Sequence, residues 1–291
     1  MRGVRLGTFN VMHGRSARDG EVDLERFRAA VAELDCDVLA AQEVDLDQPR
    51  SGGADLCALA ADALGIPADG RRFAATVYGT PGFAWRPADG PRPPGEPAYG
   101  IALLSRFPVV DWRVLPLGRA PVRSPIAVPG PDGWPRLILL PDEPRLAIVA
   151  RLRTPGGPLT VASTHLSFVP GWNAAQLRRL TRTLAAGVTR GAGDDRGAGD
   201  EHGAGDEREA GEAVVILGDL NLPGPLPRAL TGWRRLAARP TYPAHAPRVQ
   251  FDHVLGRGNL QPVVAVRAEQ TAISDHRALL VDLATAPRPR A

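Results

Sequence analysis

The amino-acid sequence predicts an α/β (α+β) fold in which short apolar strands alternate with amphipathic helices. Three observations lead to this prediction: a globular composition, apolar runs of strand length, and segments between them with helical spacing. Of the 291 residues, 44% are hydrophobic and 23% are charged, which is typical of globular proteins. A chain of this size buries about 75% of its unfolded surface. The composition excludes whole-chain disorder, a collagen-like fibre and a disulfide scaffold.

In the first half of the chain, strands and helices are expected in close succession. The predicted strands are Val4–Asn10, Asp37–Gln42 ending at Glu43, Arg72–Val77, Ile101–Ser105 and Val109–Leu115. A helix is expected over Asp23–Leu34, because apolar residues recur at helical spacing and Asp23 suits the N-terminal cap. A second helix is expected over Ala54–Leu64, ended by Gly65. Residues 79–98 are dense in glycine and proline and predict an irregular loop.

In the second half, a hairpin comes first. Arg145–Arg153 and Leu159–Thr164 are expected to pair around Pro155, Gly156 and Gly157. A helix follows over Asn173–Val188, with leucines on one face. The last predicted strands are Ala213–Leu217, Val249–Leu255, Val263–Ala268 and Ala278–Leu283.

The charge of the chain is unevenly distributed. Residues 191–208 repeat a glycine-rich acidic hexad three times, and residues 191–212 hold eight acids and two arginines, a net charge of −6. The whole chain carries +3, so the remainder carries +9. The repeat lacks large apolar side chains and is expected to be a disordered surface insert at 191–212. All basic residues in the body are arginines, which suit phosphate, so an anionic substrate is compatible with this charge.

The cysteines and the N-terminus argue against a zinc knuckle, a thioredoxin-type motif, a signal peptide and a membrane span. Cys36 and Cys57 belong to no CxxC pair, and both are expected to be buried thiols. The N-terminus has no apolar signal region, and no run approaches the length of a membrane span. We therefore expect a cytoplasmic protein without a membrane span, monomeric by default.

Polar side chains recur at the ends of the predicted buried strands. These residues are Asn10, Glu43, His165, Asp219, Asn221, Asp252, Asp275 and His276. Functional residues are often carried by loops and strand ends on a rigid scaffold. The pattern predicts a single site at one rim of the sheets.

The residue types at this rim favour metal-assisted hydrolysis. Glu43 and Asp275 offer the hard oxygen ligands that Mg²⁺ prefers. Asp219 and Asn221 lie two residues apart, so in an extended chain both side chains point the same way, one to orient water and one to donate to an oxyanion. A histidine beside a carboxylate pairs an acid–base group with an orienting group. The set holds no serine or cysteine nucleophile, which favours direct attack by water.

Seven segments occur in the order seen in the endonuclease/exonuclease/phosphatase superfamily. They are Thr8–Val11, Ala41–Asp45, Gly100–Pro108, Ser163–Leu166, Gly218–Asn221, Asp252–Leu255 and Ser274–His276. The chain therefore resembles this superfamily over residues 1–285, less the insert. The resemblance implies one domain with a four-layered α-β-β-α sandwich of two mainly antiparallel sheets and helices outside. Residues 286–291 are expected to be a flexible tail.

The resemblance also implies hydrolysis of phosphate esters that depends on Mg²⁺, or alternatively on Mn²⁺. Glu43 resembles the main metal ligand, with Asn10 and Asp275 beside it. Asp219 resembles the group that orients or deprotonates the attacking water.

The remaining implied roles concern the transition state. Asn221 resembles the donor that stabilises it. His165 and His276 resemble the pair that contacts the scissile phosphate, and Asp252 resembles the carboxylate that orients His276. In the branch of pancreatic deoxyribonuclease, a glutamate supports the first histidine, but the corresponding place near Tyr99 has no carboxylate.

The resemblance does not fix the branch of the superfamily or the substrate. The segments around Glu43–Asp45 and Thr241–Ala244 look nearer to bacterial sphingomyelinase-like hydrolases than to abasic-site repair nucleases. The leading expectation is a phosphodiesterase of nuclease type, acting on nucleic acid, lipid or a small phosphate ester. The alternatives are a phosphomonoesterase, a phospholipid hydrolase and, more distantly, a non-catalytic module with the same fold.

Overall fold

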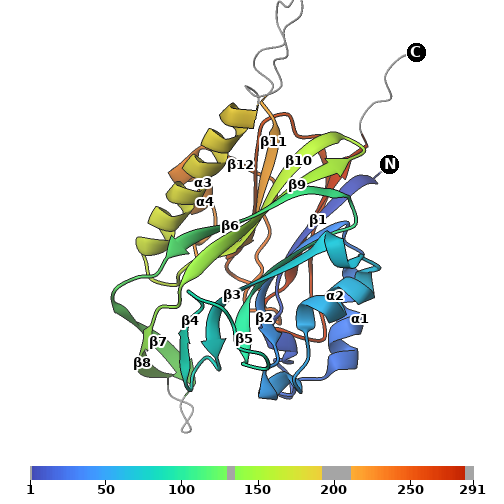
Figure 1. The fold of residues 1–291 in the computed structure, drawn as a ribbon. Helices are drawn as coiled ribbons and strands as arrows, with labels where there is room; N and C mark the ends of the chain where they lie inside the picture. Colours follow the sequence, from blue (N-terminus) through green and yellow to red (C-terminus); the bar gives the residue numbers. More distant parts are fainter. Residues whose placement is uncertain (1, 130–134, 192–210, 286–291) are drawn as a thin grey trace, which may run out of the picture.

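Two β-sheets pack face to face between two layers of helices in the computed structural model, which describes residues 2–129, 135–191 and 211–285 (Figure 1). The seven-stranded sheet has the order β14-β15-β1-β2-β5-β3-β4. Its strands are β1 (Arg2–Asn10), β2 (Val38–Leu46), β3 (Arg71–Gly79), β4 (Trp85–Pro87), β5 (Ala98–Ser105), β14 (Val263–Glu269) and β15 (Ala278–Ala284). The expected four-layered sandwich is confirmed.

The second sheet has six strands in the order β12-β13-β11-β10-β9-β6. They are β6 (Val109–Gly118), β9 (Arg145–Thr154), β10 (Gly157–His165), β11 (Ala213–Asp219), β12 (Arg234–Arg235) and β13 (Asp252–Arg257). Only the pairs β1/β2 and β10/β11 are parallel among the pairings described. A separate hairpin joins β7 (Arg123–Pro129) and β8 (Pro135–Pro141).

The helices cover the two outer faces. Helices α1 (Leu24–Leu34) and α2 (Leu56–Leu64) pack on the seven-stranded sheet, and α3 (Trp172–Gly191) and α4 (Leu226–Thr231) pack on the six-stranded sheet. Helix α1 begins as expected, because the Asp23 side chain accepts a hydrogen bond from the Arg26 amide at 2.9 Å. Helix α2 ends at Gly65 in the left-handed conformation.

The main core lies between the two sheets. Because side chains alternate along a strand, Leu6, Val38 and Leu103 face the opposite sheet. Val161 and Leu217 face them from the other side. This apolar layer is continuous along the central strands and leaves their ends to polar residues, which form the site described below.

Several sequence-based boundaries were wrong in informative ways. Strand β2 does not end at Glu43 but continues to Leu46 through a bulge. The expected loop over residues 79–98 contains β4, which pairs with β3. The strand expected from Val249 begins at Asp252 instead, and Val249 makes only an isolated bridge to Tyr242.

Some elements carried no recognisable sequence pattern. Helix α4 has six residues and β12 has two, which is too short for periodicity to show. The β7–β8 hairpin was also missed. The remaining predicted strands and helices are present with small shifts at their ends.

The acidic insert lies mostly outside the described residues, as does the tail at 286–291. The insert was expected at 191–212, but Gly191 ends α3. Glu212 also belongs to the described body, because it accepts a hydrogen bond from the Thr160 hydroxyl at 3.1 Å and lies 3.3 Å from the guanidinium of Arg151.

The cysteine prediction is confirmed. Cys36 and Cys57 are buried free thiols, and burial raises the pKa of each to about 12. Among the described helices, none has the length and apolar character needed to cross a membrane.

Candidate active site

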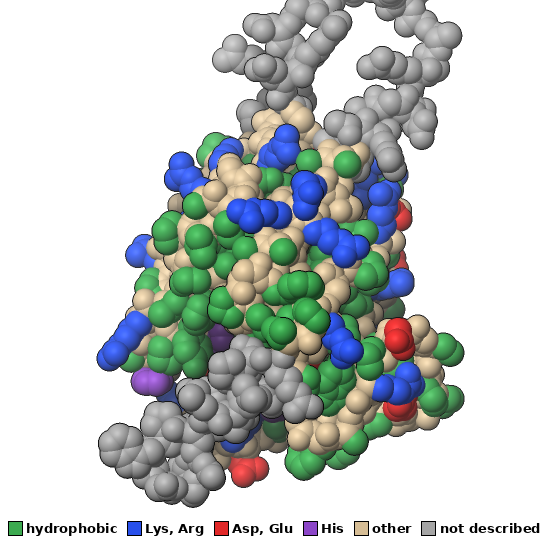
Figure 2. Space-filling view, turned by 90° about the vertical axis from the view of Figure 1, so that its left-hand side faces the viewer, with side chains coloured by type: hydrophobic (Ala, Val, Ile, Leu, Met, Phe, Trp, Pro, Cys, Tyr) green, Lys and Arg blue, Asp and Glu red, His purple; other side chains and the backbone are tan. Residues whose placement is uncertain are grey.

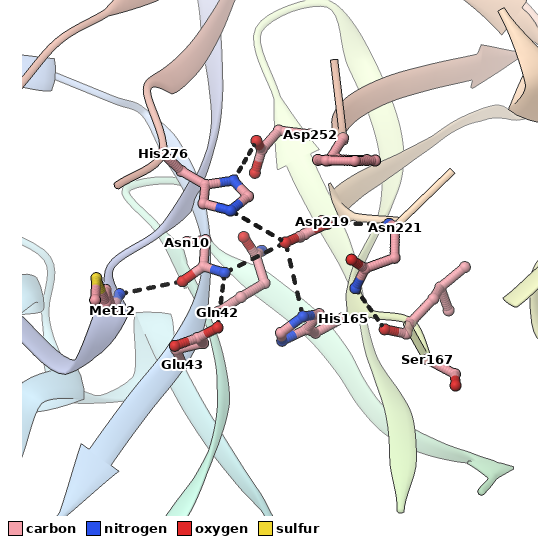
Figure 3. Close-up of polar contacts among 12 residues, drawn as sticks. Asn10, Met12, Gln42, Glu43, His165, Ser167, Asp219, Asn221, Asp252 and His276 are labelled. Atoms are coloured by element: carbon pink, nitrogen blue, oxygen red, sulfur yellow. Dashed lines mark hydrogen bonds and ion pairs between the residues drawn. The ribbon is translucent and has the colours of Figure 1, made fainter. Parts of the chain in front are cut away.

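Polar residues lie at the ends of the central strands of both sheets, where the apolar core stops, and the strand register brings them together (Figure 3). In the six-stranded sheet, His165 of β10 lies opposite Asp219 of β11, which lies opposite Asp252 of β13. Cross-strand neighbours share a face, so the three side chains lie in one row. Each is two residues from an inward-facing neighbour, such as Leu217 for Asp219, and therefore points between the sheets.

The seven-stranded sheet contributes Asn10 and Glu43 to the same rim. Asn10 ends β1 and pairs with Gln42. Glu43 is an extra residue in β2, because the pairing with β5 shifts between Gln42 and Val44, and its φ is 58°. The bulge lets two successive residues, Gln42 and Glu43, approach the site.

Gly100 of β5 pairs with Val44, the residue that follows this bulge. A second bulge, in β3, lies on its other side. A Cβ atom at Gly100 would lie 2.1 Å from the carbonyl oxygen of Ala74, so only glycine permits this close approach of backbones.

Asp219 lies at the centre of the site. Its Oδ2 accepts a hydrogen bond from the Asn10 amide at 3.3 Å and lies 3.7 Å from His165 Nε2 and 3.8 Å from His276 Nε2. Its Oδ1 accepts a hydrogen bond from the backbone amide of Asn221 at 3.0 Å. One carboxylate oxygen is therefore held by backbone while the other faces both histidines.

His276 is held by Asp252. The Nδ1 of His276 donates to Asp252 Oδ2 at 2.8 Å, and Asp252 is fully buried. Ser274 holds the segment Ser274–His276 against β1. Its hydroxyl donates to the Asn10 carbonyl at 2.6 Å and accepts from the His276 amide at 3.0 Å. The structure therefore places Asp252 in contact with His276, while its role in orienting the ring stays a prediction.

A family model described as the endonuclease/exonuclease/phosphatase family matches residues 7–276. The chain belongs to the endonuclease/exonuclease/phosphatase family. No functionally curated protein matches the sequence.

Solved structures with the same fold are distant in sequence. An endonuclease/exonuclease/phosphatase from Beutenbergia cavernae is 23% identical over 100% of this chain and 74% of its own, with a TM-score of 0.61. Truncated Caenorhabditis elegans TDP2 is 16% identical, covering 97% and 98%, with a TM-score of 0.55. A mannosyl-6-phosphatase from Bacteroides thetaiotaomicron is 13% identical, covering 97% and 99%, with a TM-score of 0.56. At these identities the likeness concerns the fold alone.

The two histidines of this family member differ in protonation. Burial and the nearby charge of Arg145 lower the pKa of His165 to about 3, so its imidazole is neutral at pH 7. Burial also acts to lower the pKa of His276, but Asp252, Asp219 and Asp275 outweigh it and raise the pKa to about 10. Paired groups whose pKa values are pushed apart take different parts in acid–base chemistry.

Asn221 departs from the extended geometry expected for it. Strand β11 ends at Asp219, and Asn221 has a left-handed φ of 49°. Its side-chain amide donates to the Leu166 carbonyl at 3.0 Å, and its own carbonyl accepts from Asn173 at 2.9 Å. Asn221 lies beside the site, but its side chain does not run parallel to that of Asp219.

Glu43 has the properties expected of a cation ligand. Its Oε1 accepts from the Asn10 amide at 3.0 Å, and burial raises its pKa to about 7, with nearby Asp275 and Asp219 adding to the increase. A cation would relieve this cost of clustered carboxylates. Asn10 turns its amide nitrogen towards the carboxylates, because its oxygen accepts from the Met12 amide at 3.1 Å.

A second acidic group also meets simple distance requirements for a metal. Ligand atoms of Asp219, Asp252 and His276 lie within 4.8 Å of one another. In this group, however, Nδ1 of His276 is already hydrogen-bonded to Asp252 at 2.8 Å, and the neighbouring carboxylates raise the pKa of the ring to about 10, whereas a metal binds the neutral imidazole. These contacts form a hydrogen-bonded relay, and Glu43 and Asp275 are the carboxylates outside it that could hold a cation.

Two residues at the site, Arg145 and Tyr242, were not among the predicted site residues. Arg145, at the start of β9, is 5% exposed, and its Nε has no hydrogen-bond partner in the described part of the chain. Its charge acts on both His165 and Glu43. Tyr242 places its ring 4.9 Å from that of His276 at an angle of 49°. Polar character at the end of a predicted strand was the search criterion, and Arg145 begins one instead.

Backbone strain is concentrated at the site. Seven described residues other than glycine have positive φ, and five of them lie in or beside the site: Met12, His13, Glu43, Asn221 and Ser274. Such conformations cost about 1–3 kcal/mol each and persist where the surrounding structure enforces them. The strain favours a functional constraint at this rim.

The surface seen from the side of α3 is rich in arginine, while carboxylates gather near one margin (Figure 2). This distribution agrees with the basic body inferred from the sequence. A positive surface attracts anionic substrates over distances set by the salt concentration.

Proposed function

We propose that the chain is a divalent-metal-dependent phosphodiesterase of nuclease type that cleaves a phosphate ester by direct attack of water. The observation that supports this most is the position of Asp219, whose Oδ2 lies within 4 Å of two histidines of opposite protonation. Such a carboxylate is suited to orient a water molecule and accept its proton.

The two histidines would then act on the phosphoryl group in different ways. His276 carries a proton on Nε2 and can donate it to a phosphoryl or leaving-group oxygen, while Asp252 stabilises the imidazolium. His165 is neutral and can donate a hydrogen bond without proton transfer. Asn221, in the proposed role of transition-state donor, would have to release Leu166 first.

Glu43 and Asp275 are proposed to hold the cation, with Mg²⁺ as the expected ion and Mn²⁺ as a substitute. When bound, the ion would neutralise charge that develops on the phosphoryl oxygens. Asn10 is proposed to keep Glu43 in place through its amide nitrogen rather than to bind the ion by that atom. The carboxylate-rich donor set fits a hard cation.

A phosphomonoester is the second candidate substrate, and Arg145 favours it. Its guanidinium lies 3.5 Å from Asp142 and 3.9 Å from Glu143, but its buried Nε has no partner among the described residues and could donate to the additional oxygen of a terminal phosphate. A phospholipid substrate remains an alternative from the sequence resemblance, with no contact that favours it.

The test is hydrolysis of bis-p-nitrophenyl phosphate and p-nitrophenyl phosphate by the full-length protein, with excess chelator and after addition of Mg²⁺ or Mn²⁺. We expect the diester to be cleaved faster, chelation to abolish cleavage, and added metal to restore it. Full activity in excess chelator would contradict the metal role. Faster cleavage of the monoester would favour the second candidate. No cleavage of either, with metal present and the fold intact, would contradict hydrolysis.

A further inference from the structure

A cleft of about 550 Å³ lies at the outer edge of the six-stranded sheet. It is formed by α4, β12 and the start of β14, and none of the active-site residues lines it. Three of its lining residues are arginines, Arg228, Arg234 and Arg235, and none is acidic. Its volume falls within the range of about 300–1,000 Å³ typical of small-ligand sites.

The arginines of this cleft lack counter-ions. Within residues 2–129, 135–191 and 211–285, the side chains of Arg228 and Arg234 make no hydrogen bond or ion pair. Arg235 donates to Gln250 through Nη2, but its Nε is buried without a partner. Burial lowers the pKa of Arg235, and no carboxylate opposes that effect. Three positive charges are therefore gathered around one concavity without compensation.

We propose that this cleft binds a phosphate group of a polyanionic ligand, apart from the reaction centre. The guanidinium fork matches the oxygens of phosphate in two-point contacts. Leu236, Pro262 and Val263 supply an apolar wall, which lowers the local dielectric and strengthens such contacts. Binding here does not depend on the hydrolysis proposed above.

The cleft lies near the active-site rim along β13, although Arg235 and Asp252 lie on opposite faces of the sheet, because Leu255 faces outward and Val254 faces inward. Arg235 pairs with Leu255 of β13, three residues from Asp252, a distance of about 10 Å at ~3.3 Å per residue. Gln250 joins the two places, because it accepts from Arg235 and donates to the Asp252 carbonyl at 3.0 Å.

The experiment is a titration with inorganic pyrophosphate in the presence of chelator, followed by the indole NMR signal of Trp233. Trp233 is buried and lies between the cleft residues Gly232 and Arg234, so its signal reports on the cleft rather than on the active site. The test variant is Arg228→Gln with Arg234→Gln, both exposed. The control is Arg72→Gln with Arg153→Gln, two exposed arginines on β3 and β9 that change the net charge equally.

We expect the test variant to bind pyrophosphate at least tenfold more weakly and the control to stay within twofold of the wild type, all with unchanged melting temperatures. A second arm uses a single-stranded decathymidylate. If the ligand is a nucleic-acid strand, the test variant also lowers the salt slope by about 1.4, since each lost phosphate contact contributes about 0.7. An effect on pyrophosphate alone identifies a small polyphosphate. No shift of the Trp233 signal, or equal losses in test and control variants, would overturn the proposal.

Discussion

Burial of His253, next to the active-site rim, makes the free energy of unfolding depend on pH. Replacing this residue tests that dependence quantitatively. His253 follows Asp252 in β13 and is fully buried. Its Nε2 donates to the Leu222 carbonyl at 2.7 Å, which ties the loop after Asn221 to β13. Burial, with a contribution from Arg235, lowers the pKa of His253 to about 4.

The lowered pKa determines in which direction the stability of the fold changes with pH. The unfolded chain takes up a proton at this histidine below about pH 6.5, whereas the folded chain does so only near pH 4. The stabilising contribution is therefore complete above pH 6.5 and is lost as the pH falls towards 4. A shift from 6.5 to about 4 corresponds to ~3 kcal/mol at ~1.36 kcal/mol per pKa unit, of which ~2 kcal/mol is lost between pH 8 and pH 5.

The variant His253→Gln keeps a donor for Leu222 but cannot be charged. Urea unfolding at several pH values between 8 and 5 measures the free energy of unfolding for both proteins. We expect the wild type to lose ~2 kcal/mol more than the variant over this range. The other histidines titrate in both proteins and cancel in the difference. Parallel pH profiles, within about 0.5 kcal/mol, would refute the reasoning that the fold excludes the charged form.

Three further predictions concern the metal, a helix cap and the buried arginine. Glu43→Gln is expected to weaken Mg²⁺ activation at least tenfold while leaving the melting temperature nearly unchanged, and an unchanged Mg²⁺ titration would argue against Glu43 as ligand. The side chain of Asp55 caps α2 by accepting a hydrogen bond from the Ala58 amide at 2.9 Å. Asp55→Ala should therefore lower the free energy of unfolding by ~1 kcal/mol. The control Asp62→Ala, on the exposed face of α2, should leave it unchanged. Arg145→Lys keeps the charge but loses the fork, so kcat/KM for p-nitrophenyl phosphate should fall at least tenfold, and more than for the diester; equal losses would indicate a general structural role.

The layers and most of the site residues were predictable, because the sequence features that produce them are local, such as a helix cap, or periodic, such as apolar spacing. Apolar spacing determined α1, and the Asp23 cap set its start. The strand ends at Asn10, His165 and Asp219 were visible because a buried run changes abruptly to polar residues. Their meeting at one rim was predicted from the repetition of this pattern, and the strand order and register of the two sheets bring it about.

The features that escaped prediction depend on tertiary contacts. The bulge at Glu43 appears only in the pairing of β2 with β5, and the turn at Asn221 has Leu166 and Asn173 as partners. No spacing rule reveals either. The burial of Arg145 is likewise a property of the packed rim.

The protonation states were also beyond the sequence. His165 and His276 are the same residue type, yet burial and Arg145 lower the pKa of the first, while Asp252, Asp219 and Asp275 outweigh burial and raise the pKa of the second. This difference depends on which groups the fold gathers around each ring. The identity of the two site histidines in the sequence does not reveal this difference in pKa.

The central claim is that Asp219 and His276 act as one catalytic unit on a water molecule and a phosphoryl group. The most direct measurement is the turnover of Asp219→Asn, His276→Ala and the double variant on a verified phosphate ester, with saturating Mg²⁺. We expect each single variant to lose ~10²–10⁴-fold in kcat, with a smaller change in KM. Because groups that act together are not additive, the double variant should be scarcely worse than the poorer single variant. Folded single variants with turnover near that of the wild type would contradict the whole assignment.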